Sequence, residues 1–321
     1  MKVVITDHGF PGIVQEQEIM AQAGASLLVA QARTPEALIV VCHDADALLV
    51  QWSPITKEVI DALEHCRVIV RYGIGTDNID LQAATEKGIP VCNVPDYCIP
   101  EVADHSLALA LALARQLPQT DAVFRGGEWK IIPPTPFPAF RDVTFATAGF
   151  GRIARAVLDR ARVFGFQTAA YDPFVSSEDF KKAGVRQLDR GELYQEAGIL
   201  SLHLPLLPET RHFVNRDTLA RMRKDAIIVN TARGALIDTV ALAEALHSGT
   251  IQAAGIDVFE AEPPALDHPL RTAPRTILTS HTAWYSSGSI PILQSLAAKE
   301  VVRALEGKPL QNVVNAARPK N

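Results

Sequence analysis

The sequence is poor in cysteine and shows none of the spacings that cysteine-based sites require. Its 321 residues include four cysteines, namely Cys42, Cys66, Cys92 and Cys98. None forms a C-x-x-C pair, the spacing typical of zinc and redox sites. In a chain of this length we expect them to be small buried residues, and we expect no bound metal.

The sequence also lacks an excess of charge and a long apolar run. Its 31 basic and 36 acidic residues give a net charge of -5, without the clustered Lys and Arg of a nucleic-acid-binding surface. The apolar run Leu107–Ala114 is far shorter than the roughly 20 residues that span a bilayer. Pro11 and Gly12 follow the N-terminal run before a signal-peptide core could form. We therefore expect a cytoplasmic protein with neither a nucleic-acid nor a membrane partner.

Short apolar runs alternate with longer helical stretches, and the length suggests two domains at about 150 residues each. The first group of runs is Val3–Thr6, Leu27–Ala30, Ala47–Val50, Val68–Val70 and Pro90–Val94. The second group is Thr144–Ala148, Gln167–Tyr171, Ile199–Leu204, Ala226–Asn230, Ala253–Val258 and Thr276–Ser280. This alternation predicts βαβ units and parallel sheets, hence an α/β protein. Ser53 and Pro54 have the character of N-cap and N1 residues and predict a helix over 54–63.

Two segments break the alternation. Residues 101–115 are rich in Ala and Leu and predict one helix, apolar nearly all round and buried between domains or subunits. A proline cluster at Pro133, Pro134, Pro136 and Pro138 predicts an arm or connector without regular structure.

A glycine-rich turn follows the run Thr144–Ala148 and opens a helical stretch. It reads Gly149-Phe150-Gly151-Arg152-Ile153-Ala154, which is the G-x-G-x-x-A pattern of dinucleotide-binding turns. Asp172 ends the next strand about 20 residues later, where an acidic residue hydrogen-bonds the ribose hydroxyls. Asp172-Pro173 is also a common turn pair. The complete order predicts NAD binding, and NAD is favoured over NADP because no Arg directly follows Asp172.

Three later segments carry polar residues at strand ends, the edge where open α/β sheets bind ligands. They are Asn230–Gly234, Gly255–Pro263 and Ser280–Tyr285. Singly, each is compatible with an ordinary turn, loop or core residue. Together they predict a guanidinium, a carboxylate and an imidazole at one edge of the nucleotide-binding sheet.

The order NTARG, GIDVFEAEPP and SHTAW resembles the D-isomer-specific 2-hydroxyacid dehydrogenases. Residues 71–80 and 93–95 are similar to the first domain of that family, and residues 202–210 to a further block of its nucleotide domain. The similarity runs from about residue 68 to residue 315. It points to the branch that contains phosphoglycerate dehydrogenases and C-terminal-binding proteins.

The resemblance implies an NAD-dependent oxidoreductase that acts on CH-OH groups and interconverts small 2-keto and 2-hydroxy acids. Arg233 would bind the substrate carboxylate and carbonyl. His281 would be the acid and base, and Glu262 would hold the imidazole and favour its protonated form.

The remaining site residues follow from the same resemblance. The cofactor would contact the turn Gly149–Ile153 (Gly149, Gly151, Arg152 and Ile153) and Asp172, His203, Pro205, Thr231 and Asp257, with Asp257 on the carboxamide. The substrate carboxylate would bind around Arg71, Gly73 and Ile74, and Trp284 would line the substrate pocket.

The implied architecture has two Rossmann-like domains. Residues 1–97 and 287–321 would form a flavodoxin-like substrate domain, and residues 98–286 a doubly wound NAD-binding domain, with the active site in the cleft. The buried helix and the proline-rich arm resemble the dimer surface of the family, so we expect a homodimer.

Two features leave alternatives open. The family's strand before the glycine turn usually has Gly-Lys-Thr and then a Gly, whereas this sequence has Asp142-Val143-Thr144 and Ala146, with Thr147 after it. We interpret these differences as local packing changes. Residues 281–286 and 171–174 are similar to the C-terminal-binding protein corepressors. The alternative function is therefore an NAD(H)-sensing scaffold with little turnover.

Overall fold

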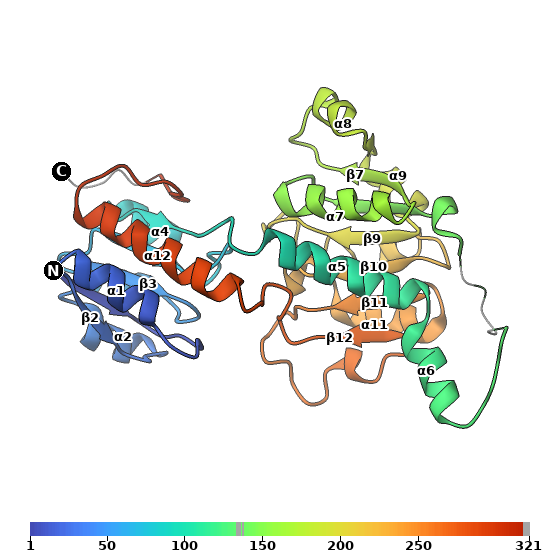
Figure 1. Ribbon diagram of the computed structural model, residues 1–321, viewed down its shortest axis with the longest axis horizontal. Helices are drawn as coiled ribbons and strands as arrows, with labels where there is room; N and C mark the ends of the chain where they lie inside the picture. Colours follow the sequence, from blue (N-terminus) through green and yellow to red (C-terminus); the bar gives the residue numbers. More distant parts are fainter. Residues whose placement is uncertain (133–135, 137, 317–321) are drawn as a thin grey trace. The chain divides into compact units, whose positions relative to one another are not determined.

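The computed structural model describes residues 1–132, 136 and 138–316, which divide into two compact units (Figure 1). Unit 1 comprises Met1–Cys98 and the segment from Tyr285 onward, and unit 2 comprises Ile99–Trp284. This division lies within two residues of the predicted one. Pro133 and Pro134 of the predicted arm lie outside the described residues.

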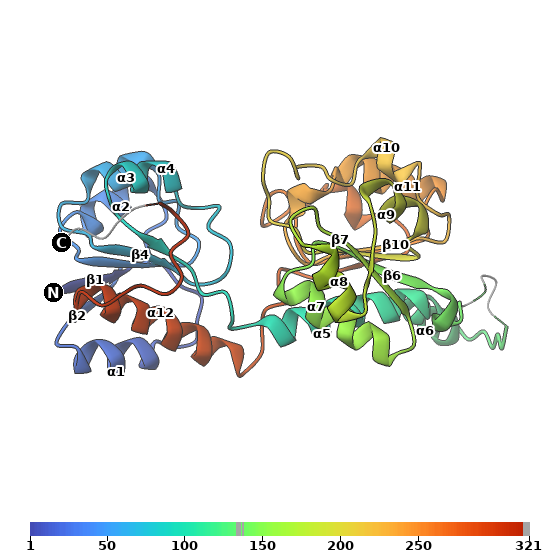
Figure 2. The same cartoon turned by 90° about the horizontal axis from the view of Figure 1, so that it is seen from above.

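In unit 1 the described residues form a five-stranded parallel sheet in the order β2-β1-β3-β4-β5. Its strands are β1 (Lys2–Ile5), β2 (Ser26–Val29), β3 (Ala47–Val50), β4 (Val68–Arg71) and β5 (Val91–Cys92). Helices α1 (Val14–Gln22) and α12 (Ser289–Leu305) pack together on one face, and α2 (Pro35–Cys42), α3 (Lys57–Ala62) and α4 (Leu81–Glu86) cover the other (Figure 2). Helix α12 follows unit 2 in the chain, so the C-terminal segment completes the N-terminal unit.

Helix α3 begins later than the Ser53-Pro54 pair predicts. Thr56 is its N-cap residue, because Ile55 is extended and forms a parallel bridge with Ile79. The Ser53 hydroxyl does not cap a helix but donates to the Ala32 carbonyl at 2.7 Å. Tertiary pairing of Ile55 therefore overrides the local capping signal.

In unit 2 the described residues form a seven-stranded parallel sheet in the order β12-β11-β10-β9-β6-β7-β8. The strands are β6 (Thr144–Ala148), β7 (Gln167–Tyr171), β8 (Arg186–Gln187), β9 (Ile199–Leu202), β10 (Ile227–Asn230), β11 (Ala253–Ile256) and β12 (Thr276–Leu278). Helices α5 (Ile99–Ala114) and α7 (Arg152–Val163) cover one face, and α9 (Arg190–Glu196), α10 (Arg216–Leu219) and α11 (Thr239–Ser248) the other (Figure 2). The strand order reverses beside β6, as in a doubly wound fold, and the predicted α/β class is confirmed.

Helix α5 corrects one expectation. It is not apolar all round: Asp104 is exposed, and the buried face packs on α7 and on strands β10 and β11 of its own unit. The approach to the sheet is close, because a Cβ at Gly255 of β11 would lie 3.0 Å from the Leu109 side chain. Packing on the sheet of unit 2 therefore explains why this helix is rich in Ala and Leu.

The four cysteines are free and buried, as predicted. Among the described residues, no group of three or more His, Cys, Asp or Glu side chains is placed to hold a metal ion. No helix in the described part of the chain has both the length and the apolar character needed to cross a membrane.

Candidate active site

The glycine turn lies at the carboxyl end of β6, where the strand order reverses. Gly149 has a φ of +96°, and a Cβ there would lie 2.6 Å from the carbonyl oxygen of His203, so only glycine fits. Gly151 is the N-cap residue of α7, and a Cβ built there meets no atom within 4 Å. The space beside the first N–H groups of α7 is therefore open, and this helix begins with Arg152 and Ile153. A pyrophosphate fits such a helix start.

Two side chains hold the glycine turn in place. The Asp172 carboxylate, just beyond β7, accepts the Phe150 N–H at 2.9 Å and the Phe174 N–H at 3.0 Å. The hydroxyl of Thr147, one of the residues that depart from the family pattern, donates to the Gly149 carbonyl at 2.8 Å. Asp172 therefore does form the turn that Asp-Pro suggests, and it also connects that turn to the glycine loop.

His203 follows β9 and borders the same loop. Burial lowers the pKa of His203 to about 3, so its ring is neutral near pH 7. Its Nε2 lies 2.9 Å from the Ser201 hydroxyl. Pro205, two residues further on, is exposed.

Arg233 is placed by the loop that follows β10. The buried Asn230 donates from Nδ2 to the Arg233 carbonyl at 2.8 Å and accepts the Ala232 N–H at 3.1 Å. Thr231 pairs with the hydroxyl of Ser106 on α5 at 2.8 Å. These hydrogen bonds therefore fix the backbone around Arg233.

Gly234 brings this loop against the segment that carries Glu262. A Cβ at Gly234 would lie 1.9 Å from the Phe259 carbonyl carbon and 2.3 Å from the Glu260 nitrogen. Backbone therefore packs directly on backbone at this point. Position 234 requires glycine because the two loops approach so closely that a side chain has no room.

Glu262 and His281 form an ion pair, with 2.6 Å between Glu262 Oε2 and His281 Nδ1. The other carboxylate oxygen accepts the Phe259 N–H at 2.9 Å. Burial alone would raise the pKa of Glu262, but the hydrogen bond and charge of His281, together with the charge of Arg233, lower it. Because Nδ1 is held by the carboxylate, Nε2 is the ring nitrogen that can face a substrate.

The backbone of His281 adopts a left-handed conformation with a φ of +55°, which is uncommon for a residue with a side chain. Asp257 stabilises it: its carbonyl accepts the His281 N–H at 2.7 Å, and its carboxylate accepts the N–H groups of Thr282 at 2.9 Å and Ala283 at 3.0 Å. Asp257 is fully buried. Its contacts show a positioning role for the histidine loop, whereas its contact with the carboxamide stays a prediction.

Two further residues, His105 and Thr279, were not recognised from the sequence. The Thr279 hydroxyl donates to Asp257 Oδ1 at 2.5 Å and therefore accepts from His105 Nε2 at 3.1 Å. His105 and Ser106 are adjacent polar residues of α5. Through them this helix contacts the loops of both Thr231 and His281. Adjacent polar residues within the Ala/Leu-rich run were the signal available in the sequence.

The family follows from comparison with known proteins. Residues 107–283, more than half of the chain, match the family model for "D-isomer specific 2-hydroxyacid dehydrogenase, NAD binding domain". The chain belongs to the D-isomer specific 2-hydroxyacid dehydrogenases. The predicted family and the predicted cofactor, NAD, are both confirmed.

Relatives in this dehydrogenase family differ in length and name. D-3-phosphoglycerate dehydrogenase of Methanocaldococcus jannaschii is 39% identical over 322 residues, covering 98% of this chain but only 59% of that protein. Glyoxylate reductase of Korarchaeum cryptofilum is 37% identical over 277 residues, which cover 85% of this chain and 83% of the relative. The crystal structure of a glyoxylate reductase from Paecilomyes thermophila gives a TM-score of 0.87 at 29% identity, covering 98% of each chain.

In unit 1 the predicted carboxylate-binding residues lie at the end of β4 and directly after it. Gly73 has a φ of +133°, and a Cβ there would lie 1.7 Å from Arg71 Nη1, so the arginine side chain lies directly over the glycine. Asn93 donates to the Ile74 carbonyl at 2.7 Å and fixes the loop. Trp284, the last residue of unit 2, is half-buried.

Proposed function

We propose that the chain catalyses reversible hydride transfer between NAD(H) and a small 2-keto or 2-hydroxy acid. The Glu262–His281 pair carries this proposal, because it holds an acid–base group at the carboxyl edge of an NAD-binding sheet. Both side chains are partly exposed, at 36% and 41%, and so are accessible to a substrate. The names of the relatives, dehydrogenases and reductases, support an enzyme over an NAD(H)-sensing scaffold.

His281 moves the proton in this mechanism. In reduction its Nε2–H is donated to the ketone oxygen, and in oxidation the neutral Nε2 takes the proton of the hydroxyl group. Glu262 stabilises the charged imidazole that donates. Bound nicotinamide supplies or accepts the hydride.

Arg233 orients the substrate in this proposal. Its planar guanidinium suits a carboxylate and a carbonyl oxygen, and the Asn230 contacts keep its backbone in place. The N–H groups around Gly73 and Ile74, with Arg71, would bind the carboxylate. The loops supply positioning, which is the main contribution of protein to hydride transfer.

Steady-state turnover of NADH with a panel of 2-keto acids tests the proposed function. We expect measurable kcat/KM with at least one member of the panel. Absence of turnover with all of them, while NADH still binds, would contradict the proposal and favour the scaffold.

We expect the wild-type chain to use NAD(H) much better than NADP(H), since the Asp172 carboxylate repels a 2′-phosphate. Asp172→Ala should narrow this preference mainly by weakening NAD(H) binding, about 10-fold or more, because a charged hydrogen-bond acceptor is lost. Its bond to the Phe150 N–H would disappear as well. The measurement is kcat/KM with both cofactors. Comparable use of the two by the wild type would contradict the role of Asp172.

Trp284→Ala should change the ranking of 2-keto acids without abolishing activity. Trp284 lies three residues beyond His281, so its removal should raise the relative use of bulkier acids, by about 10-fold per methylene-sized contact. The measurement is kcat/KM over a graded series of acids in both proteins. An unchanged ranking with a large fall in Tm would instead make Trp284 a core residue.

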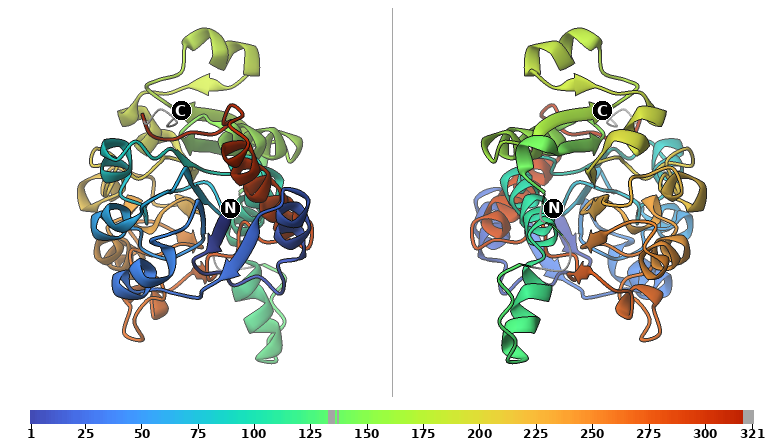
Figure 3. Two further views of the ribbon diagram at one scale, coloured as in Figure 1. Left: turned by 90° about the vertical axis from the view of Figure 1, so that its left-hand side faces the viewer. Right: turned by 90° about the vertical axis from the view of Figure 1, so that its right-hand side faces the viewer.

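Assembly and location are also proposals. Helix α6 (Leu117–Arg125) has no buried residue and extends away from the rest of unit 2 (Figures 1 and 3). The exposed apolar side chains on and after it are Leu117, Phe124, Trp129, Ile131 and Ile132. We propose that a second copy covers them in a homodimer. Free, buried cysteines support a cytoplasmic location.

A further inference from the structure

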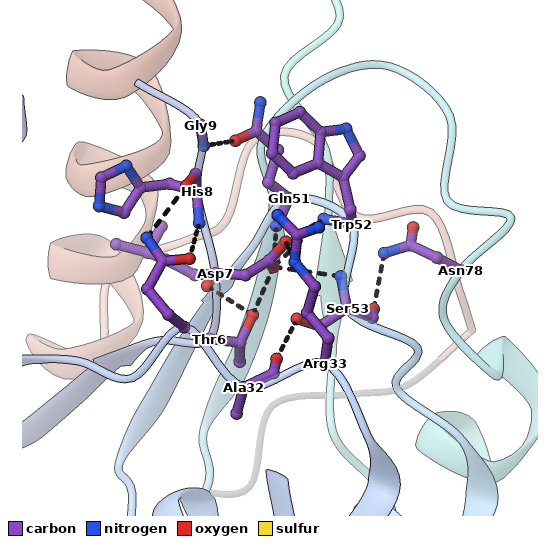
Figure 4. A network of polar contacts seen from close by, with 12 residues as sticks. Thr6, Asp7, His8, Gly9, Ala32, Arg33, Gln51, Trp52, Ser53 and Asn78 are labelled. Carbon is purple, nitrogen blue, oxygen red and sulfur yellow. Dashed lines mark hydrogen bonds and ion pairs between the residues drawn. The ribbon is translucent and has the colours of Figure 1, made fainter. Parts of the chain in front are cut away.

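Asp7 and Glu16 are fully buried carboxylate residues of unit 1 that have no part in the proposed function. The Asp7 carboxylate accepts the N–H groups of Gln51 at 3.2 Å, Trp52 at 3.1 Å and Ser53 at 3.1 Å (Figure 4). These bonds to main chain explain why Asp7 is buried, because they hold the loop that follows β3. Glu16 binds two side chains instead, so its burial needs another explanation.

The Glu16 carboxylate joins three segments of unit 1. It lies in the first turn of α1, and its Oε1 accepts the Tyr72 hydroxyl at 2.7 Å. Its Oε2 accepts from Nε2 of the buried Gln294 at 3.0 Å, and the same nitrogen donates to the Gly12 carbonyl at 2.8 Å. Glu16 therefore links α1 to α12 and to the residue that follows β4.

This polar pair is buried at a cost. Burial raises the pKa of Glu16, and the hydrogen bonds of Tyr72 and Gln294 act in the opposite direction. Burial and the charge of Glu16 raise the pKa of Tyr72 well above its ordinary value, so the hydroxyl keeps its proton and is the donor. Apolar residues of similar volume are often at least as stable in such a place. Stability alone therefore gives no reason for the pair.

Tyr72 directly precedes Gly73, where the loop proposed to bind the substrate carboxylate begins. Its N–H donates to the Val50 carbonyl of β3 at 2.7 Å, and Phe10 packs edge-on against its ring with 5.1 Å between the ring centres. Glycine restricts its own backbone little. The direction of the N–H groups of Gly73 and Ile74 therefore depends on how firmly the neighbouring residues are held.

The segment that leads from β1 to Glu16 is itself held in place. The Gly9 N–H donates to Gln51 Oε1 at 2.9 Å (Figure 4), and the His8 carbonyl accepts from Gln31 Nε2 at 3.0 Å. Gln294 holds the carbonyl of Gly12 further along. Glu16 is thus a fixed point against which the Tyr72 side chain can be held.

We propose that Glu16 is a positioning residue that acts through the Tyr72 hydroxyl and keeps the N–H groups of Gly73 and Ile74 directed at the substrate carboxylate. This inference rests on the proposed function. Hydride transfer leaves the carboxylate unchanged, so the loop binds it equally in the ground state and in the transition state. Loss of such uniform binding raises KM and leaves kcat unchanged.

The test is KM and kcat for the 2-keto acid that the wild type uses best. Tyr72→Phe removes one oxygen and keeps the ring, and it should raise KM by about 10-fold or more, the cost of a lost hydrogen bond to a charged group. Its kcat should stay close to the wild-type value. Glu16→Gln, which can still accept from Tyr72, should raise KM less. The double variant should be no worse than Tyr72→Phe alone, because both substitutions act on one contact.

Tyr194→Phe is the matched control. Tyr194 is also buried, and its hydroxyl donates to the Phe213 carbonyl at 2.7 Å in unit 2. Both Phe variants should lower Tm, but only Tyr72→Phe should raise KM.

An unchanged KM in Tyr72→Phe, an equal rise in Tyr194→Phe, or a fall in kcat without a rise in KM would overturn the inference. Circular dichroism checks that each variant is folded. If Tyr72→Phe does not fold, Glu16→Gln decides: a raised KM with wild-type kcat supports the positioning role, and an unchanged KM overturns it.

Failure of the proposed function gives a different result, namely no turnover with any acid. Calorimetric binding of oxamate, which carries a carboxylate beside a carbonyl group, to the NADH-loaded proteins would then decide the role of Glu16. Weaker binding to Tyr72→Phe than to the wild type and Tyr194→Phe supports the inference. Equal binding to all three, or none, contradicts it.

Discussion

Replacing His281 with alanine is expected to lower kcat by about 10²- to 10⁴-fold while the Kd for NADH stays close to the wild-type value. The imidazole is held by Glu262 at 2.6 Å. In the proposed mechanism it acts on a substrate oxygen, whereas the glycine turn binds the dinucleotide. Stopped-flow turnover and fluorescence titration with NADH measure the two quantities. Arg233→Ala should lose turnover in the same way, because the proposed mechanism places its guanidinium on the substrate as well.

Matched controls for these variants are His65→Ala and Arg223→Ala. His65 is an exposed histidine of unit 1, and Arg223 is paired on the surface with Asp225 at 2.8 Å. Both controls should keep wild-type kcat. A collapse of NADH affinity in both His281→Ala and Arg233→Ala would show that the division between cofactor and substrate residues is wrong.

Gly234→Ala is expected to lower kcat/KM by about 10²-fold or more, the cost of misplacing reacting groups by about 1 Å. The new methyl group would overlap the backbone at Phe259 and Glu260, so the segment carrying Glu262 must move away from His281. Tm should fall as well, because the overlap is with main chain and cannot be relieved by a side-chain rotation.

Gly12→Ala is the control for this substitution, since a Cβ at Gly12 meets nothing within 4 Å. It should leave both Tm and kcat/KM close to wild type. If Gly234→Ala retained wild-type kcat/KM, the close approach of the two loops would have no part in placing Glu262.

The strand pattern and the glycine turn could be predicted because their signals are local. Buried strands of a parallel sheet are continuous apolar runs in the sequence. The G-x-G-x-x-A pattern of Gly149 to Ala154 by itself indicates a turn followed by the start of a helix. Arg233, Glu262 and His281 could be proposed because each lies in a segment that follows such a strand, and because the order of these segments resembles the family. The start of the helix predicted at Ser53-Pro54 was wrong for the converse reason, since the pairing of Ile55 with Ile79 depends on a distant segment.

The hydrogen bonds that position the loops of the site could not be predicted in the same way. The bonds of Asp257 to Thr282 and of Thr279 to His105 join residues that are 25 and 174 positions apart. Nothing in a single sequence says that a buried aspartate will accept backbone N–H groups from another loop. The same holds for Asp7, whose buried carboxylate accepts the N–H groups of residues 51–53 in the loop after β3.

The bond pattern of Asp7 has a consequence for how this protein can change over evolutionary time. The path of residues 51–53 is set by a carboxylate that binds their main chain, and any amino acid except proline provides that N–H group. Position 52 can therefore mutate without rebuilding the loop. The course of this loop is therefore inherited separately from the side chains that it displays.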